Sequence, residues 1–234
     1  MADDSFDPYV YPGTSVLVNR LEITDPTEFS VVERRLSWAG RLSLESDPVA
    51  QTYDMDHVCA IHARLFSSLY SWAGRLRNVD LAKGDTHFLP HQFLSQGSEY
   101  FSHLVAESPL LNSDVSADVF VIGAAKILTV LNDIHPFREG NGRTQRAFID
   151  DLAKISHRQI TWRNVTKQEM MTASARAAND DSDQTDWTYF ADLFLAMLEQ
   201  PLDGSSVLEP EIYSTQGADN VLKKWKGHLS TEDQ

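Results

Sequence analysis

The sequence lacks the features that mark secreted or membrane-spanning proteins. It has a single cysteine, Cys59, so no disulfide can form within the chain, and its first residues are acidic rather than basic and apolar. Its longest apolar run, Val119–Ala125, has seven residues, far short of the roughly 18 needed to cross a bilayer. We therefore expect a cytoplasmic protein with no membrane segment.

Basic residues are also scarce. Lys and Arg number 20 against 34 Asp and Glu, which gives the 234 residues a formal net charge of −14. This charge opposes direct binding to duplex nucleic acid, so any bound phosphate must occupy a local site. Gly and Pro, with 11 and 9 residues, are too few for a fibrous or disordered chain, and no repeat or flexible linker divides it.

The hydrophobic periodicity predicts one mostly helical unit with an all-α fold. Asp25-Pro26 supplies a cap and a first residue for a helix that runs toward Leu44. A short helix is expected over Thr14–Leu21. The other predicted helices run over 54–70, 92–107, 118–134, 143–156, 167–178 and 187–200.

The period changes over residues 79–89, where apolar and polar residues alternate on both sides of a turn at Lys83-Gly84-Asp85-Thr86. This pattern predicts a small β-hairpin within about 76–90. The predicted parts of the chain are an N-terminal arm with helices packed on the core (1–50), a core with the hairpin (51–200), and a C-terminal tail of low order (201–234) with one short helix at 218–228.

One segment between two apolar helices concentrates residues that can do chemistry, His135-Pro136-Phe137-Arg138-Glu139-Gly140-Asn141-Gly142-Arg143-Thr144-Gln145-Arg146. Because proline disfavours helical geometry at the residue before it, the preceding helix should end at His135 and present its imidazole. Gly140-Asn141-Gly142 tolerates positive φ just before a helix, which directs backbone N–H groups at one spot. That spot suits a phosphate.

The local charge of this segment agrees with anion binding. Arg143 and Arg146 share a face of the first turn of the following helix, where the helix dipole is already positive, and a bound anion would explain them. Glu139 would repel a phosphate unless a divalent cation such as Mg²⁺ lay between them. Phe137 is expected to bury its ring and so to fix the direction of its neighbours.

These twelve residues resemble the signature of Fic-domain proteins, His-x-Phe-x-Asp/Glu-Gly-Asn-Gly-Arg-x-x-Arg, with every fixed position filled. Trp72-Ala73-Gly74 and Arg77 resemble the turn that precedes the hairpin flap of that family. Tyr11-Pro12-Gly13-Thr14 is similar to the opening of bacterial Fic toxins and of the Fic domains of type IV secreted effectors.

The resemblance implies the Fic fold, a helical bundle around the signature loop with a hairpin flap. It also implies transfer of AMP from ATP to a hydroxyl side chain of a target protein, with Mg²⁺. An intact Gly142 favours this reaction over phosphorylation. The implied roles are general base for His135, Mg²⁺ ligand for Glu139, phosphate cradle for Gly140, Asn141 and Gly142, ligands of the β- and γ-phosphates for Arg143 and Arg146, and target docking for the flap residues Leu81, Ala82, Lys83 and Gly84.

Many Fic enzymes are inhibited by a glutamate in a Ser/Thr-x-x-x-Glu-Gly/Asn motif that pairs with the second arginine, here Arg146. Two partial matches, Thr24–Glu28 and Ser205–Glu209, lack the final Gly or Asn. This departure suggests a toxin-like protein inhibited by a small antitoxin-like partner that carries the motif, while control by the tail stays open. The alternative function is a catalytically quiet module that binds a nucleotide or a partner.

Two other candidate groups are weaker. Cys59 and His62 are three residues apart on a predicted helix, but no second pair of ligands stands at a suitable spacing, so core packing is favoured over a metal site. His87 and His91 near the hairpin are interpreted as exposed polar residues rather than substrate contacts.

Overall fold

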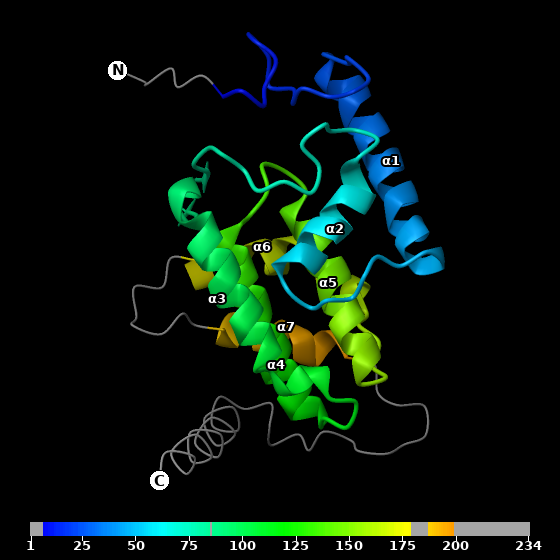
Figure 1. The fold of residues 1–234 in the computed structure, drawn as a ribbon, viewed down its shortest axis with the longest axis vertical. Helices are drawn as coiled ribbons and strands as arrows, with labels where there is room; N and C mark the ends of the chain where they lie inside the picture. The colour runs from blue at the N-terminus through cyan, green and yellow to red at the C-terminus, as the bar shows by residue number, and fades with distance from the viewer. Residues whose placement is uncertain (1–6, 85, 179–186, 199–234) are drawn as a thin grey trace. The chain divides into compact units, whose positions relative to one another are not determined.

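The computed structural model describes residues 7–84, 86–178 and 187–198, and within them it confirms an all-α fold with one small hairpin (Figure 1). The predicted tail and its short helix lie outside the described residues. No helix among the described residues is long and apolar enough to cross a membrane.

The elements are α1 Pro26–Ser46, α2 Met55–Phe66, β1 Ala82–Lys83, β2 Thr86–His87, α3 Leu94–Ala106, α4 Ala117–Ile134, α5 Asn141–Ile155, α6 Lys167–Ala178 and α7 Thr188–Met197, with 3₁₀ turns η1 His91–Phe93, η2 Pro109–Leu111 and η3 Trp162–Asn164.

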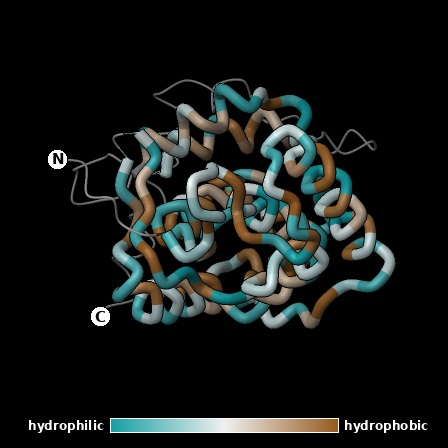
Figure 2. Tube along the Cα trace, turned by 90° about the horizontal axis from the view of Figure 1, so that it is seen from above, coloured by the Kyte–Doolittle hydropathy of each residue, from teal (hydrophilic) through white to brown (hydrophobic). Residues whose placement is uncertain are grey.

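Helix α4 forms the centre of the core because it is hydrophobic around most of its circumference. It packs against α3, α5, α6 and α7, and its residues Phe120, Ala124 and Leu131 have no exposed surface. The other helices bury one face each, and hydrophobic and hydrophilic positions accordingly alternate along their coils in Figure 2. Helix α4 is therefore buried on most of its sides.

Helices α1 and α2 begin at capping residues. The side chain of Asp25 accepts a hydrogen bond from the backbone N–H of Glu28 (2.7 Å), and that of Asp54 accepts one from His57 (2.9 Å). Helix α2 ends at Phe66, before the predicted end at Tyr70, because the chain tightens there into a turn.

The prediction of a short helix over Thr14–Leu21 is wrong. This segment folds back on the preceding residues, with a bridge between Val10 and Leu17. The Asn19 side chain accepts from the backbone N–H groups of Leu21 and Ile23 and donates to the carbonyls of Leu17 and Ile23. These bonds offer the backbone an alternative to helical pairing.

The hairpin is shorter than the predicted alternation over 79–89. Ala82 pairs with His87, and Lys83 pairs with Thr86. Beyond β2 the chain attaches to the end of α4, where the backbone N–H of Leu89 donates to the carbonyl of Asp133 (2.9 Å). The hairpin is thus held next to the signature loop.

Candidate active site

Helix α4 ends at Ile134 and leaves His135 at the edge of a cleft, with a left-handed backbone (φ 43°, ψ 62°). The Nδ1 atom of His135 lies 3.3 Å from the carbonyl oxygen of Asn132. Because a carbonyl only accepts, a neutral His135 ring carries its proton on Nδ1 and leaves Nε2 as a proton acceptor. The ring stacks on Phe88, with centroids 3.7 Å apart.

Burial is the main cause that lowers the pKa of His135 from its ordinary 6.5 to about 4. The hydrogen bond to Asn132 raises this pKa, and the nearby cations of Arg77 and Lys83 lower it. The imidazole is therefore neutral near pH 7, which is the protonation state that a general base requires.

The loop after His135 closes on itself through the side chain of Asn141. The Phe137 N–H donates to Oδ1 of Asn141 (2.9 Å), and Nδ2 of Asn141 donates to the Phe137 carbonyl (2.7 Å). Phe137 is buried and its ring stacks on His62, with centroids 3.8 Å apart. The Asn141 side chain is thus committed to the loop, which leaves its backbone N–H in the first turn of α5 as the group that could contact a phosphate.

His62 of α2 supports the same loop at a second point. Its Nδ1 accepts from the Gly74 N–H (2.8 Å), so its Nε2 carries the proton and donates to the carbonyl of Glu139 (2.9 Å). Burial lowers the pKa of His62 to about 4, which keeps the ring neutral in this tautomer. His62 is therefore a structural residue of the loop, in agreement with the packing role expected for it.

The two glycines of the signature have different surroundings. Gly140 has φ +85°, and a Cβ there would lie 2.5 Å from the ring of Phe66. Gly142 has nothing within 4 Å of a Cβ. Gly140 is therefore required by the backbone turn and its packing, whereas Gly142 leaves open space at the start of α5.

Glu139 lies between the loop and α5 with about half of its side chain exposed (48%). Its Oε1 accepts from the Gly140 N–H (2.9 Å) and lies 3.3 Å from Nη2 of Arg143. No hydrogen bond among the described residues engages its Oε2. Mg²⁺ is usually bound through one or two carboxylates together with phosphates and water, so Glu139 fits this metal.

The structure separates the two signature arginines, which were expected to act together. Arg143 turns toward α1, where its Nη2 lies 2.6 Å from Oε1 of Glu33 and its Nη1 donates to Oγ of Ser37 (2.9 Å). Its guanidinium also covers the ring of Phe66 at 4.7 Å. A phosphate contact of Arg143 would require it to leave Glu33, a residue for which the sequence gives no local signal.

Arg146 instead lines the cleft, and no carboxylate of the described residues lies within ion-pair distance of it. The nearest candidate on its own helix, Asp150, is bound by Arg41 (2.6 Å) and by Nε1 of Trp162 (2.7 Å). Burial, first, and the neighbouring charges of Arg143 and Arg41 lower the pKa of Arg146. Its positive charge is left for an anion.

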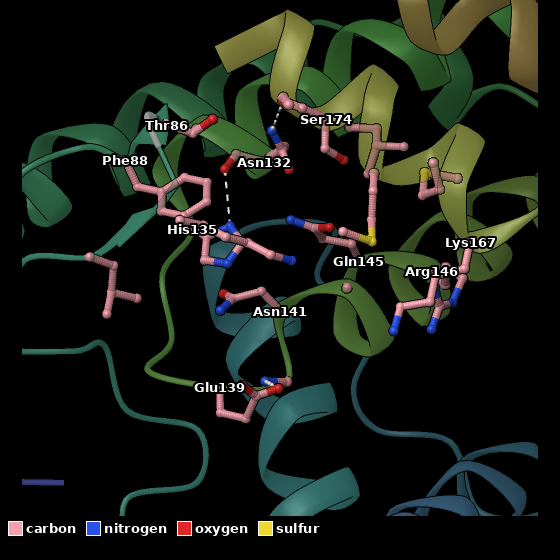
Figure 3. Close-up of a pocket in the computed structure, with 18 of the residues that line it drawn as sticks. Thr86, Phe88, Asn132, His135, Glu139, Asn141, Gln145, Arg146, Lys167 and Ser174 are labelled. Carbon is pink, nitrogen blue, oxygen red and sulfur yellow. Dashed lines mark hydrogen bonds between the residues drawn. The ribbon is translucent and has the colours of Figure 1, made fainter. Parts of the chain in front are cut away.

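The cleft has a volume of about 1020 Å³ and runs between the hairpin, the signature loop and α6. Figure 3 shows His135 and Phe88 at one end, Arg146 and Lys167 at the other, and Gln145 between them. All four predicted flap residues, Leu81, Ala82, Lys83 and Gly84, line it. Sequence reasoning missed the opposite wall, which includes Trp162, Arg163, Lys167, Met170 and Ser174.

The remaining candidates lie apart from this cleft. His91 is exposed and its Nδ1 lies 2.8 Å from Oδ1 of Asp80, while His87 does not line the cleft. Burial raises the pKa of the Cys59 thiol to about 11. Within the described part of the chain, no group of three His, Cys, Asp or Glu residues could hold a metal ion.

Comparison with known proteins assigns the family. The Fic/DOC family model matches residues 52–153. The probable protein adenylyltransferase Fic of Salmonella typhimurium is 30% identical over 176 residues, which cover 75% of this chain and 86% of that protein. The chain belongs to the Fic family. Protein adenylyltransferase VbhT of Bartonella schoenbuchensis is 36% identical to this Fic chain over 182 residues, 77% of the chain but only 38% of the length of VbhT.

Solved structures show the same Fic fold. The N-terminal FIC domain of Bep8 from Bartonella sp. 1-1C matches with 25% identity and a TM-score of 0.76, over 85% of this chain and 97% of that one. The N-terminal Fic domain of a Bartonella effector protein from Bartonella sp. AR 15-3 matches with 26% identity and a TM-score of 0.73, over 82% and 91%. The Fic fold implied by the signature is therefore confirmed.

The difference between the two glycines can be tested by unfolding in urea. Gly140→Ala should lower the free energy of unfolding by about 1–3 kcal/mol, because the new Cβ overlaps Phe66 and the backbone is left-handed. Gly142→Ala should change it by less than about 0.5 kcal/mol. Equal losses in the two variants would contradict the separate roles.

Proposed function

We propose that this Fic chain is a protein adenylyltransferase, which transfers AMP from ATP to a hydroxyl side chain of a target protein. The observation that carries this proposal is one cleft that holds a neutral histidine, the N-terminus of α5 and an arginine that has no ion-pair partner in the described part of the chain. A module that only binds phosphate would need the last two and not the histidine. The names of the curated relatives support the same activity.

In this proposal ATP lies along the cleft with its phosphates at the start of α5. The backbone N–H groups of residues 140–142 and the side chain of Arg146 bind them. Arg143 becomes a phosphate ligand only by exchanging Glu33 for the nucleotide. Leu128, Met170 and Ala175 line the part of the cleft next to α6, and this apolar wall suits a purine base.

The reaction uses His135 as the general base. Its Nε2 takes the proton of the target hydroxyl while the hydroxyl oxygen bonds to the α-phosphorus, and the bond from that phosphorus to the bridging oxygen breaks to release pyrophosphate. The N-terminus of α5 and Arg146 stabilise the charge that develops. Glu139 would hold Mg²⁺, and the bound metal would neutralise charge on the phosphate oxygens.

The target docks at the hairpin in this proposal. Strand β1 is exposed, and Ala82 and Lys83 lie next to the cleft entrance that holds His135. An extended segment of a partner can pair with such an edge, which brings its hydroxyl toward the α-phosphorus.

The position of the label in ATP tests this reaction. ATP labelled at the α-phosphate should label proteins of a bacterial lysate with Mg²⁺ present, and ATP labelled at the γ-phosphate should not. Label from the γ-phosphate would show phosphorylation instead. ATP binding without any transfer by the wild type would support the quiet binding module.

His135→Ala should lower transfer by roughly 10²–10⁴-fold and leave ATP affinity unchanged, because the base acts only along the reaction path. A variant that lost ATP binding together with transfer would contradict the role of His135 as the base.

The lowered pKa of His135 predicts the pH dependence of the reaction. kcat/KM should stay nearly constant from pH 7 to 5, because the base stays neutral until the pH approaches 4. With a histidine of ordinary pKa as the base, kcat/KM would fall roughly thirtyfold by pH 5. Burial raises the pKa of the neighbouring Asp133 to about 7, so Asp133→Asn is the control. A thirtyfold loss that persists in Asp133→Asn would contradict the neutral histidine.

Among the described residues Arg146 has no ion-pair partner, and this motivates a proposal about how the enzyme is controlled. We propose a toxin-like enzyme that a separate antitoxin-like protein silences, since a glutamate from a Ser/Thr-x-x-x-Glu-Gly/Asn helix would pair with Arg146 and exclude the γ-phosphate. The full-length chain, a Glu209→Gly variant and a chain that ends at Gln200 should then have equal activity in the lysate assay. Strong activation by Glu209→Gly would show instead that the tail is the inhibitor.

A further inference from the structure

Arg77, in the turn before the hairpin, has its side chain buried among backbone carbonyls, with only 3% of the residue exposed. Its Nε donates to the carbonyl of His135 (2.9 Å), and its Nη2 donates to that of Ile134 (3.2 Å) and to that of Leu89. Its Nη1 donates to the carbonyl of Val79 (2.7 Å). No carboxylate among the described residues lies within ion-pair distance of this guanidinium.

A buried cation without a carboxylate is costly unless other groups replace its hydration. The carbonyls at the C-terminal end of α4 do this, because they carry the negative end of the helix dipole. The flat guanidinium also presents its donors in several fixed directions at once, which the single ammonium of a lysine does not. The four carbonyls therefore select arginine by geometry as well as by charge.

These four carbonyls belong to two parts of the chain. Val79 and Leu89 are the residues on either side of the hairpin, and Ile134 and His135 end α4. The backbone N–H of Arg77 adds a bond to the carbonyl of Pro136 (2.9 Å). One side chain thus fastens both ends of the hairpin to the backbone of the histidine.

We propose that Arg77 is a positioning residue that fixes the hairpin and His135 in position relative to each other, so that a hydroxyl docked on the hairpin lies next to the general base. This inference rests on the proposed function. Arg77 does not line the cleft and contacts neither Arg146 nor the start of α5. Its loss should therefore impair transfer and spare nucleotide binding.

The test compares Arg77→Lys with Arg158→Lys in the full-length protein. Arg158 is the matched control because it also donates to a backbone carbonyl, that of Val115 (2.6 Å), and does not line the cleft. Amide hydrogen exchange is measured by mass spectrometry for peptides over 79–89 and 134–137, together with ATP affinity and the rate of AMP transfer to lysate proteins.

In Arg77→Lys both peptides should lose protection from hydrogen exchange together. The rate of AMP transfer should fall by about 10²-fold, because a small displacement of the reacting groups costs about that much. ATP affinity should not change. Arg158→Lys should show none of these effects. Unchanged exchange at either peptide, a chain-wide loss of protection, or a transfer rate equal to that of Arg158→Lys would overturn the inference. If the wild type transfers nothing, the proposed function fails, and the exchange data still decide whether Arg77 links the two segments.

Discussion

The carbonyl groups at the buried end of helix α4 need hydrogen-bond donors, because the last turn of a helix leaves four of them without a partner in the helix. Each of them finds a donor around the helix end. The carbonyl of Leu131 accepts from the capping N–H of His135 and from Nε2 of Gln145. That of Asn132 is reached by Nδ1 of His135, that of Asp133 by the Leu89 N–H, and that of Ile134 by Arg77. Satisfying this helix end therefore brings α5, the hairpin and the signature loop to one place, and the cleft forms around it.

The charges of the cleft also depend on contacts between distant elements. Two arginines stand three residues apart on α5, yet Glu33 neutralises Arg143 while Arg146 has no acidic partner among the described residues. In a chain with a net charge of −14, a partly buried cation without an ion-pair partner among the described residues attracts an anion locally. The placement of Glu33 on α1 thus decides which arginine is available to a ligand before any ligand binds.

The local features of the site could be predicted from the sequence. Pro136 predicts the end of α4, Asp25 predicts the start of α1, and the glycines predict the turn at Gly140, because each depends on neighbouring residues alone. The Thr14–Leu21 segment was predicted wrongly because its apolar residues suggested a helix while the Asn19 side chain captures the backbone.

Other features depend on contacts between distant segments and have no local signal. The ion pair of Glu33 with Arg143 joins α1 to α5. The wall of the cleft formed by α6 comes from residues that follow the signature only after the rest of α5 and the turn η3. Arg77 is a similar case, since the sequence shows an arginine before a hairpin and only the fold shows which carbonyls it meets. Local chemistry therefore predicts the reactive groups, and tertiary packing decides their partners.

The arrangement divides the cleft into two ends with separate tasks. In the proposed reaction, His135 and the hairpin at one end handle the group that receives the nucleotide, and α5, Arg146 and α6 at the other end hold the group that donates it. Gln145 lies between the two ends, and the signature loop beside them is held by His62 and closed by Asn141. Because the hairpin lies outside the signature loop, substitutions on β1 should, if the proposed docking holds, alter the choice of target without altering the groups that bind the phosphates.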